Sequence, residues 1–181
     1  AIGAGAQAAG NHSLAIGTLA TSSIKNGGSS VDKAVAIGYS AGVSDDKAIA
    51  IGSDAKSNSK SASALGDTAQ ALAENALAVG TNAQAEGVSS GAIGTKNRVT
   101  GANTYVLGSQ NSTAATGTAA DVSASNSGIF GNENRMEGDS NRIVGNQNVL
   151  KMESLSNNSA NPKAFENIFV TGNQNMVTGD P

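Results

Sequence analysis

A glycine that returns every 14 residues is the feature that most constrains how this chain folds. Between residues 34 and 108 each such glycine follows a short apolar stretch, of which Ala34-Val35-Ala36-Ile37 is the first; the glycines are Gly38, Gly52, Gly66, Gly80, Gly94 and Gly108. A fixed period of this size indicates one supersecondary unit stacked many times, because a single unit cannot bury its apolar face alone. The spacing therefore predicts a solenoid.

Each repeat contains two candidate strands. Before the glycine, apolar residues alternate with a period of two, so Val35 and Ile37 share one face while Ala34 and Ala36 share the other. A weaker alternation after the glycine, around Ala41, predicts a second strand with one face in solvent. Two strands of about five residues and two tight turns would use 14 residues. This predicts an all-β chain with one flat coil per repeat, paired in parallel with the next coil about 4.8 Å away.

A flat coil has little interior, so further apolar area must be buried elsewhere. A strand that is apolar on both faces is typical of a strand covered on both sides, and an alanine face is flat enough for another chain to approach closely. We therefore predict that the alanine face packs against copies of itself around a symmetry axis. The predicted interface residues are Ala15, Ala34, Ala36, Ala48, Ala50, Ala62, Ala64, Ala76, Ala78 and Ala92.

The repeat glycines are predicted to lie at a bend that needs either a positive φ or a close backbone approach, which a Cβ would obstruct. Three interruptions break their period, because successive glycines are seven, nine and thirteen residues further apart there. Insertions in solenoids map to loops on an accessible face. We expect a single domain, 1–181, with insertions near residues 21–31, 112–125 and 151–165. The sequence opens within a repeat, so we expect it to be part of a longer chain.

Asparagine replaces alanine three residues after the glycine in the later repeats. The asparagines are Asn97, Asn111, Asn134, Asn141, Asn148 and Asn175. Amide side chains aligned in a stack can hydrogen-bond to their neighbours above and below. The pattern predicts that an asparagine ladder takes over the corner that alanine occupies in the earlier repeats.

The composition argues against several kinds of site. With 23 glycines, 3% aromatic residues and no cysteine, the chain has neither the composition of an ordinary globular core nor a thiolate metal site. Clustered basic residues interleaved with aromatics, which would favour nucleic-acid binding, are lacking. His12 is the only histidine, and its place in the repeat favours a turn residue over a catalytic one. We therefore predict no catalytic residue, no cofactor and no metal.

Two stretches carry a family resemblance, Asn11-His12-Ser13-Leu14-Ala15-Ile16-Gly17 and Lys33-Ala34-Val35-Ala36-Ile37-Gly38, together with the corners that begin at Gly145 and Gly172. They resemble the head of trimeric autotransporter adhesins of the YadA type, and the resemblance extends over nearly the whole chain. It implies a left-handed parallel β-roll assembled as a homotrimer. It also implies the exposed head of a longer protein anchored in a Gram-negative outer membrane, with no membrane insertion by this part.

By the same resemblance the partner would be an extracellular matrix protein, a host-cell receptor or another bacterial surface, with roles in virulence and biofilm. Lys33 and Lys47 occupy one position in successive repeats, which fits either a solvated charge ladder or a stripe that faces a ligand. The insertions are the other candidate surface. The candidate ligand-binding residues are Ile24, Lys25, Asn26, Lys33, Lys47, Lys151 and Glu153.

The sequence is less consistent with two other functions, acyl transfer and ice binding. Trimeric acyltransferases with left-handed β-structure need a six-residue period and a basic histidine between subunits, so the 14-residue period and the lone His12 argue against an enzyme of that class. Ice binding would need a regular array such as repeated Thr-x-Thr, which is absent. A structural spacer that binds nothing remains open.

Overall fold

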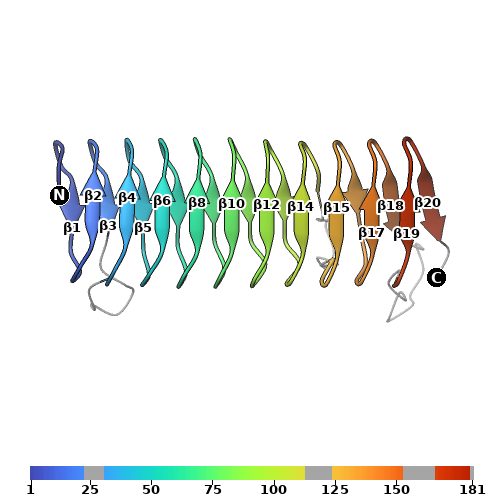
Figure 1. The fold of residues 1–181 in the computed structure, drawn as a ribbon, viewed down its shortest axis with the longest axis horizontal. Coiled ribbons are helices and arrows are strands. Elements are labelled where there is room, and N and C mark those ends of the chain that lie inside the picture. Colours follow the sequence, from blue (N-terminus) through green and yellow to red (C-terminus); the bar gives the residue numbers. More distant parts are fainter. Residues whose placement is uncertain (23–30, 113–123, 153–165, 180–181) are drawn as a thin grey trace, which may run out of the picture.

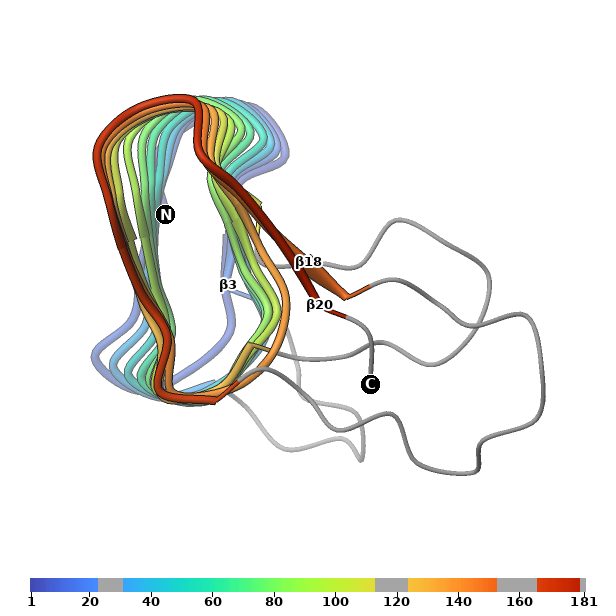
Figure 2. The ribbon, with the colours of Figure 1, turned by 90° about the vertical axis from the view of Figure 1, so that its right-hand side faces the viewer.

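The computed structural model describes residues 1–22, 31–112, 124–152 and 166–179, and within these ranges every regular element is a β-strand. The coils form a straight stack, with the N-terminus at one end and the C-terminus at the other (Figure 1). Seen along the stack, each coil has one strand in each of two facing layers (Figure 2). The chain is therefore a parallel β-roll, which confirms the solenoid predicted from the glycine period.

One layer is a ten-stranded parallel sheet made of the strands that precede the repeat glycines. In chain order its strands are β2 (Leu14–Ile16), β4 (Val35–Ile37), β6 (Ile49–Ile51), β8 (Ser63–Leu65), β10 (Leu77–Val79), β12 (Gly91–Ile93), β14 (Tyr105–Leu107), β15 (Gly128–Phe130), β17 (Arg142–Val144) and β19 (Phe169–Thr171).

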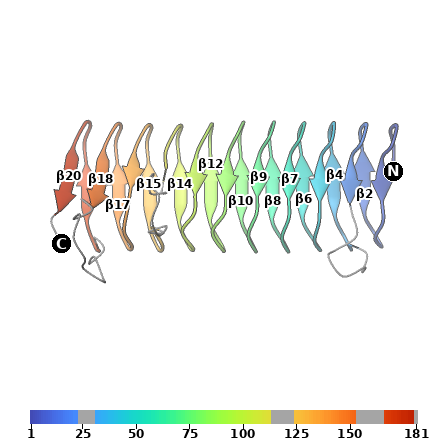
Figure 3. The ribbon, with the colours of Figure 1, turned by 180° about the vertical axis from the view of Figure 1, so that it is seen from behind.

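The other layer, called here the opposite sheet, consists of a seven-stranded and a three-stranded parallel sheet (Figure 3). Ser112 joins them through single bridges to Arg98 and Arg135. The strands of the opposite sheet are β1 (Gln7–Ala8), β3 (Thr21–Ser22), β5 (Gly42–Val43), β7 (Lys56–Ser57), β9 (Gln70–Ala71), β11 (Gln84–Ala85), β13 (Arg98–Val99), β16 (Arg135–Met136), β18 (Val149–Met152) and β20 (Met176–Gly179).

The register of the ten-stranded sheet follows the repeat across all three interruptions. Leu14 pairs with Val35, 21 residues away, although regular neighbours such as 35 and 49 are 14 apart. At the two later interruptions Tyr105 pairs with Gly128 and Arg142 with Phe169. The described strands on either side of each interruption therefore pair in the same register as the regular coils. Residues 23–30, 113–123 and 153–165 lie outside the described residues, whereas the flanking residues 21–22 and 149–152 belong to strands β3 and β18.

The strands have two to four residues, not the expected five, because each turn uses more of the chain. The regular coils turn through non-glycine residues in the left-handed region, such as His12 at φ 58°, Lys47 at 59° and Asp54 at 53°. That region disfavours L-residues other than glycine and asparagine. The period alone does not reveal these positions.

The repeat glycines meet both conditions predicted for them. Gly52 has φ 135°, and a Cβ built on it would lie 2.3 Å from the carbonyl oxygen of Gly66 in the next coil. Such a contact is too short for any real Cβ atom. Glycine is required at this corner because the backbones of successive coils touch there.

The alanine side chains point into the coil, so the predicted interface residues are wrong. Ala15, Ala34, Ala36, Ala48, Ala50, Ala62, Ala64, Ala76, Ala78 and Ala92 are at most 1% exposed within a single chain. A side chain without exposed surface cannot contact a second chain. The physical reason is thickness: two sheets joined by such short turns lie close together, and only small side chains fit between them at normal packing density.

The interior holds larger side chains toward the C-terminal end. There Val106, Ile129 and Ile143 replace the inward alanines of the ten-stranded sheet, and Met136 and Leu150 face them from the opposite sheet. All five are at most 3% exposed. The C-terminal coils therefore have a more conventional hydrophobic core than the alanine-filled coils before them.

Candidate assembly and binding surfaces

The outer face of the ten-stranded sheet is apolar and uncovered within one chain. Its side chains are those at the first and third positions of each strand, such as Val35 and Ile37 in β4, which flank the buried Ala36. Among the exposed large apolar residues of the described chain, those on this face are Leu14, Ile51, Tyr105, Leu107, Phe130, Val144 and Phe169. Arg142 is the charged residue among these outward positions of the described strands.

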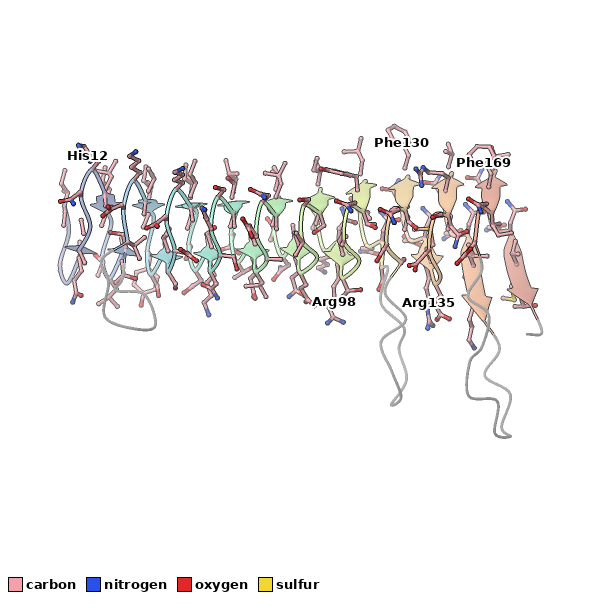
Figure 4. The ribbon with its side chains drawn as sticks, turned by 90° about the horizontal axis from the view of Figure 1, so that it is seen from below. His12, Arg98, Phe130, Arg135 and Phe169 are labelled. Carbon is pink, nitrogen blue, oxygen red and sulfur yellow. The ribbon has the colours of Figure 1, made fainter. Side chains whose placement is uncertain are left out.

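The opposite sheet presents a polar outer face. Lys56, Gln70, Gln84 and Arg98 occupy equivalent outward positions in four successive coils. The Arg98 guanidinium pairs with the Glu86 carboxylate, with Nε and Oε1 2.9 Å apart. Phe130 and Phe169 project from one side of the roll, whereas Arg98 and Arg135 project from the other (Figure 4). The roll therefore has two chemically distinct faces.

The predicted asparagine ladder exists, and it is buried from Asn97 to Asn148, whereas Asn175 at its end is exposed. It links Asn97, Asn111, Asn134, Asn148 and Asn175 in successive coils. In a typical rung, Asn134 Oδ1 accepts hydrogen bonds from both the backbone N and the Nδ2 of Asn148, each 2.9 Å away. Its own Nδ2 donates to the carbonyl oxygen of Gly145 at 2.8 Å. The amides thereby hold adjacent coils together.

The prediction that Asn141 belongs to this ladder is wrong, because Asn141 lies at the other corner of the coil. Its backbone N donates to the Ser127 hydroxyl at 3.0 Å, and its Oδ1 accepts from the backbone N of Ile168 at 2.9 Å. Half a repeat separates Asn141 from Asn134 and from Asn148, which places it opposite them. The seven-residue spacing of glycines in this part of the chain hid the difference.

A second asparagine ladder, on the surface, was missed. Asn132 donates through its backbone N and its Nδ2 to Asn146 Oδ1, both at 3.0 Å, and Asn146 does the same to Asn173. These residues directly follow the repeat glycines. The recurrent Gly-Asn-x-Asn motif could have predicted two ladders: its first asparagine forms the exposed ladder and its second forms the buried one.

Hydrogen bonds connect successive coils at the corner that carries Lys33 and Lys47. Asp46 Oδ1 accepts a hydrogen bond from the backbone N of Asp32 at 2.8 Å, and the backbone N of Lys47 donates to the carbonyl oxygen of Asp32 at 2.9 Å. Both lysines are exposed. Lys151 is also exposed, at the far end of the roll in β18, so the structure does not bring it together with Lys33 and Lys47. Ile24, Lys25, Asn26 and Glu153 lie outside the described residues.

His12 is an exposed turn residue, as predicted. Across the described ranges, no three His, Asp or Glu side chains come together in a way that could hold a metal ion. Nor do these ranges contain a helix with the length and apolar character needed to cross a membrane.

A stack of parallel coils with one apolar and one polar outer face defines the β-roll solenoids. The family model of the YadA head domain repeat matches residues 1–20, 32–55 and 57–83, in two copies. The part of the chain up to residue 83 therefore matches YadA head domain repeats, which confirms the predicted resemblance to the heads of YadA-type trimeric autotransporter adhesins. The first gap in the match contains the first interruption of the period. Among curated proteins, none matches the chain.

Proposed function

We propose that this chain is the surface-displayed head of a bacterial adhesin, a left-handed β-roll that assembles as a homotrimer through the outer face of the ten-stranded sheet. The observation that carries the proposal is the continuous apolar strip on an otherwise polar roll. Ten strands spaced about 4.8 Å apart and three residues wide span about 45 Å by 10 Å. An exposed apolar patch of about 450 Å² is comparable to the largest patch of a typical monomer, which is often a functional site.

A second copy of the chain suits this strip better than an unrelated protein. In a parallel assembly the second copy has the same 14-residue coil. Its outward side chains therefore recur along the stack at the same spacing as the outward side chains of the first copy. Every row can then contact an equivalent row, which a partner with another period could not do. Three chains around one axis would bury the strip completely and leave the opposite sheets facing outward.

The adhesive surface would then be the polar exterior, which is extended and repetitive. We propose that the corner with Lys33 and Lys47 and the region around Lys151 contact the target, together with Ile24, Lys25, Asn26 and Glu153. The target would be an extracellular matrix protein, a host-cell receptor or another bacterium, met at a Gram-negative cell surface. Threefold repetition lets weak contacts combine through effective concentration. The role is attachment without catalysis.

Assembly can be tested by light scattering coupled to size exclusion, which should return three chains. Ile51→Glu places a charge on the apolar strip and should weaken the trimer, whereas Gln70→Glu on the opposite sheet should leave it unchanged. Ile51 is 37% exposed within one chain, so the substitution tests the assembly more than the fold of the monomer. A monomeric wild type, or a trimer indifferent to Ile51→Glu, would contradict the proposed interface.

Adhesion can be tested with the intact trimer on matrix proteins, cultured cells and bacteria. Reversing two charges with Lys33→Glu and Lys47→Glu should reduce attachment several-fold if this corner contacts the target, and Lys56→Glu on the opposite sheet is the matched control. If the variant with Lys33→Glu and Lys47→Glu attaches as well as the Lys56→Glu control, this corner does not contact the target. If the wild-type trimer attaches to none of these surfaces, a structural spacer becomes the better account.

A further inference from the structure

The outer face of the ten-stranded sheet changes character toward its C-terminal end, where it becomes aromatic. A hollow of about 300 Å³ opens there, and its lining includes Tyr105, Leu107, Gly128, Phe130 and Arg142. The outward residues of the first strands are aliphatic, such as Val35 and Ile37. The hollow is thus a local feature of an otherwise flat strip.

Gly128 provides the open space in this hollow. It lies between Tyr105 and Arg142 in the sheet register. Its φ is outside the left-handed region, so the backbone conformation does not require glycine here. A Cβ on Gly128 would contact only the Arg142 side chain closely, at 3.2 Å from Cδ. The Arg142 side chain therefore lies against one side of Gly128, and the hollow opens beside it.

The neighbouring glycine on the same face is already covered by its own chain. A Cβ on Gly91 would lie 2.6 Å from Cδ1 of Tyr105, so the tyrosine ring fills the space that Gly91 leaves. On the other side of the hollow, Arg142 is held in place because its Nη1 donates to the carbonyl oxygens of Asn126 at 2.8 Å and Asn141 at 3.0 Å. The hollow beside Gly128 is thus bordered by a fixed Arg142 side chain and by Tyr105, and it is open on the outer face of the sheet.

Phe130 lies on the same strand, two residues after Gly128, and its side chain is 60% exposed on the same face (Figure 4). In a cyclic assembly the third position of a strand in one copy faces the first position of the same strand in the next copy. Each strand β15 therefore offers one projecting ring and one vacant site at the same height. The two are complementary when the copies are parallel.

We infer that the Phe130 ring of each copy enters the hollow above Gly128 of the next copy, which makes β15 the anchor that sets the register of the assembly. This inference depends on the proposed homotrimer and specifies where its contacts are concentrated. Aromatic side chains buried in well-packed pockets dominate the energetics of protein interfaces. Burial of one phenyl ring changes an association constant about tenfold to a hundredfold.

The test compares the dissociation of wild type, Phe130→Ala and Gly128→Leu by analytical ultracentrifugation, with far-UV circular dichroism to confirm that each variant is folded. Each substitution should weaken association at least tenfold per contact. Gly42→Leu is the matched control, because Gly42 lies on the outer face of the opposite sheet, and a Cβ there has only the Thr21 hydroxyl nearby, at 3.8 Å. It should change dissociation less than twofold.

The double variant Gly128→Leu with Phe130→Ala adds a second readout. If the ring and the hollow meet, the two effects should be strongly non-additive, because removal of the ring leaves little for the leucine to displace. A wild-type trimer in which Gly128→Leu and Phe130→Ala behave like Gly42→Leu would refute the anchor and leave the assembly intact. A wild type that stays monomeric would refute the assembly itself.

Discussion

Replacing Asn134 with alanine is the most direct test of what holds the C-terminal coils together. The substitution removes four hydrogen bonds: those from Asn134 Nδ2 to Asn111 Oδ1 and to the Gly145 carbonyl oxygen, and those that Asn134 Oδ1 accepts from the N and Nδ2 of Asn148. At a net 0.5–1.5 kcal/mol for each bond, the loss is about 2–6 kcal/mol per chain. The Asn134 side chain is 1% exposed, so water cannot easily replace it.

Earlier coils have alanine at this corner, so the fold accommodates it. This lowers the destabilisation expected for Asn134→Ala below the upper end of that range. Ala41 occupies the equivalent corner in an earlier coil, where its backbone N donates to the Gly38 carbonyl oxygen at 3.4 Å, inside the same turn. A similar bond could form in the variant and recover part of the loss. We therefore expect a destabilisation of about 3 kcal/mol per chain.

The assay is equilibrium unfolding in guanidinium chloride followed by far-UV circular dichroism, with Asn146→Ala as the control. Asn146 makes comparable bonds in the exposed ladder, where water can substitute for them, so its replacement should cost less than about 1 kcal/mol. If Asn134→Ala destabilises the chain no more than Asn146→Ala does, burial is not what makes the inner ladder stabilising, and the reasoning is refuted.

Two further substitutions probe the interior and the corner of the coil. Ser57 has a buried hydroxyl without a hydrogen-bond partner, so Ser57→Ala should raise the free energy of unfolding by about 1 kcal/mol. Ser90 is the contrasting site, because its hydroxyl donates to a carbonyl oxygen at 2.7 Å. Ser90→Ala should therefore lower the free energy of unfolding by a similar amount. The opposite sign at Ser57 would mean that its hydroxyl has a partner after all. Gly52→Ala should cost about 2–4 kcal/mol, because the new Cβ meets the next backbone at a positive φ, whereas Gly42→Ala should change thermal unfolding little. Equal melting temperatures for these two variants would contradict the close approach of the coils.

The period of the glycines was enough to predict the coil and its parallel register, because these depend on spacing alone. The buried ladder followed for the same reason: Asn97 and Asn111 recur at the corner where alanine stood before. A spacing does not depend on which way a side chain points. Spacing failed at Asn141, because the seven-residue spacing of the later glycines does not distinguish the two corners of a coil.

The direction of the strand faces could not be predicted in the same way. A period of two separates Ala36 from Ile37 but does not say which of them is inside, since both are apolar. The distance between the two sheets decides it, and that distance depends on turns through residues such as Lys47, whose left-handed conformation has no local sequence signal. The candidate interface was placed on the wrong face because the thickness of the coil was unknown.

The stacking of the coils has a mechanical consequence for an elongated roll. A pull along the stack loads the coils in series, so the weakest pair of coils sets the rupture force and the other pairs add nothing to it. In the later described coils, side-chain hydrogen bonds such as those from Asn134 to Asn111 and from Asn148 to Asn134 cross from one coil to the next. Alanine at the same corner of the earlier coils, such as Ala41, has no side-chain donor or acceptor. We therefore expect a roll under tension to yield first among its alanine-cornered coils.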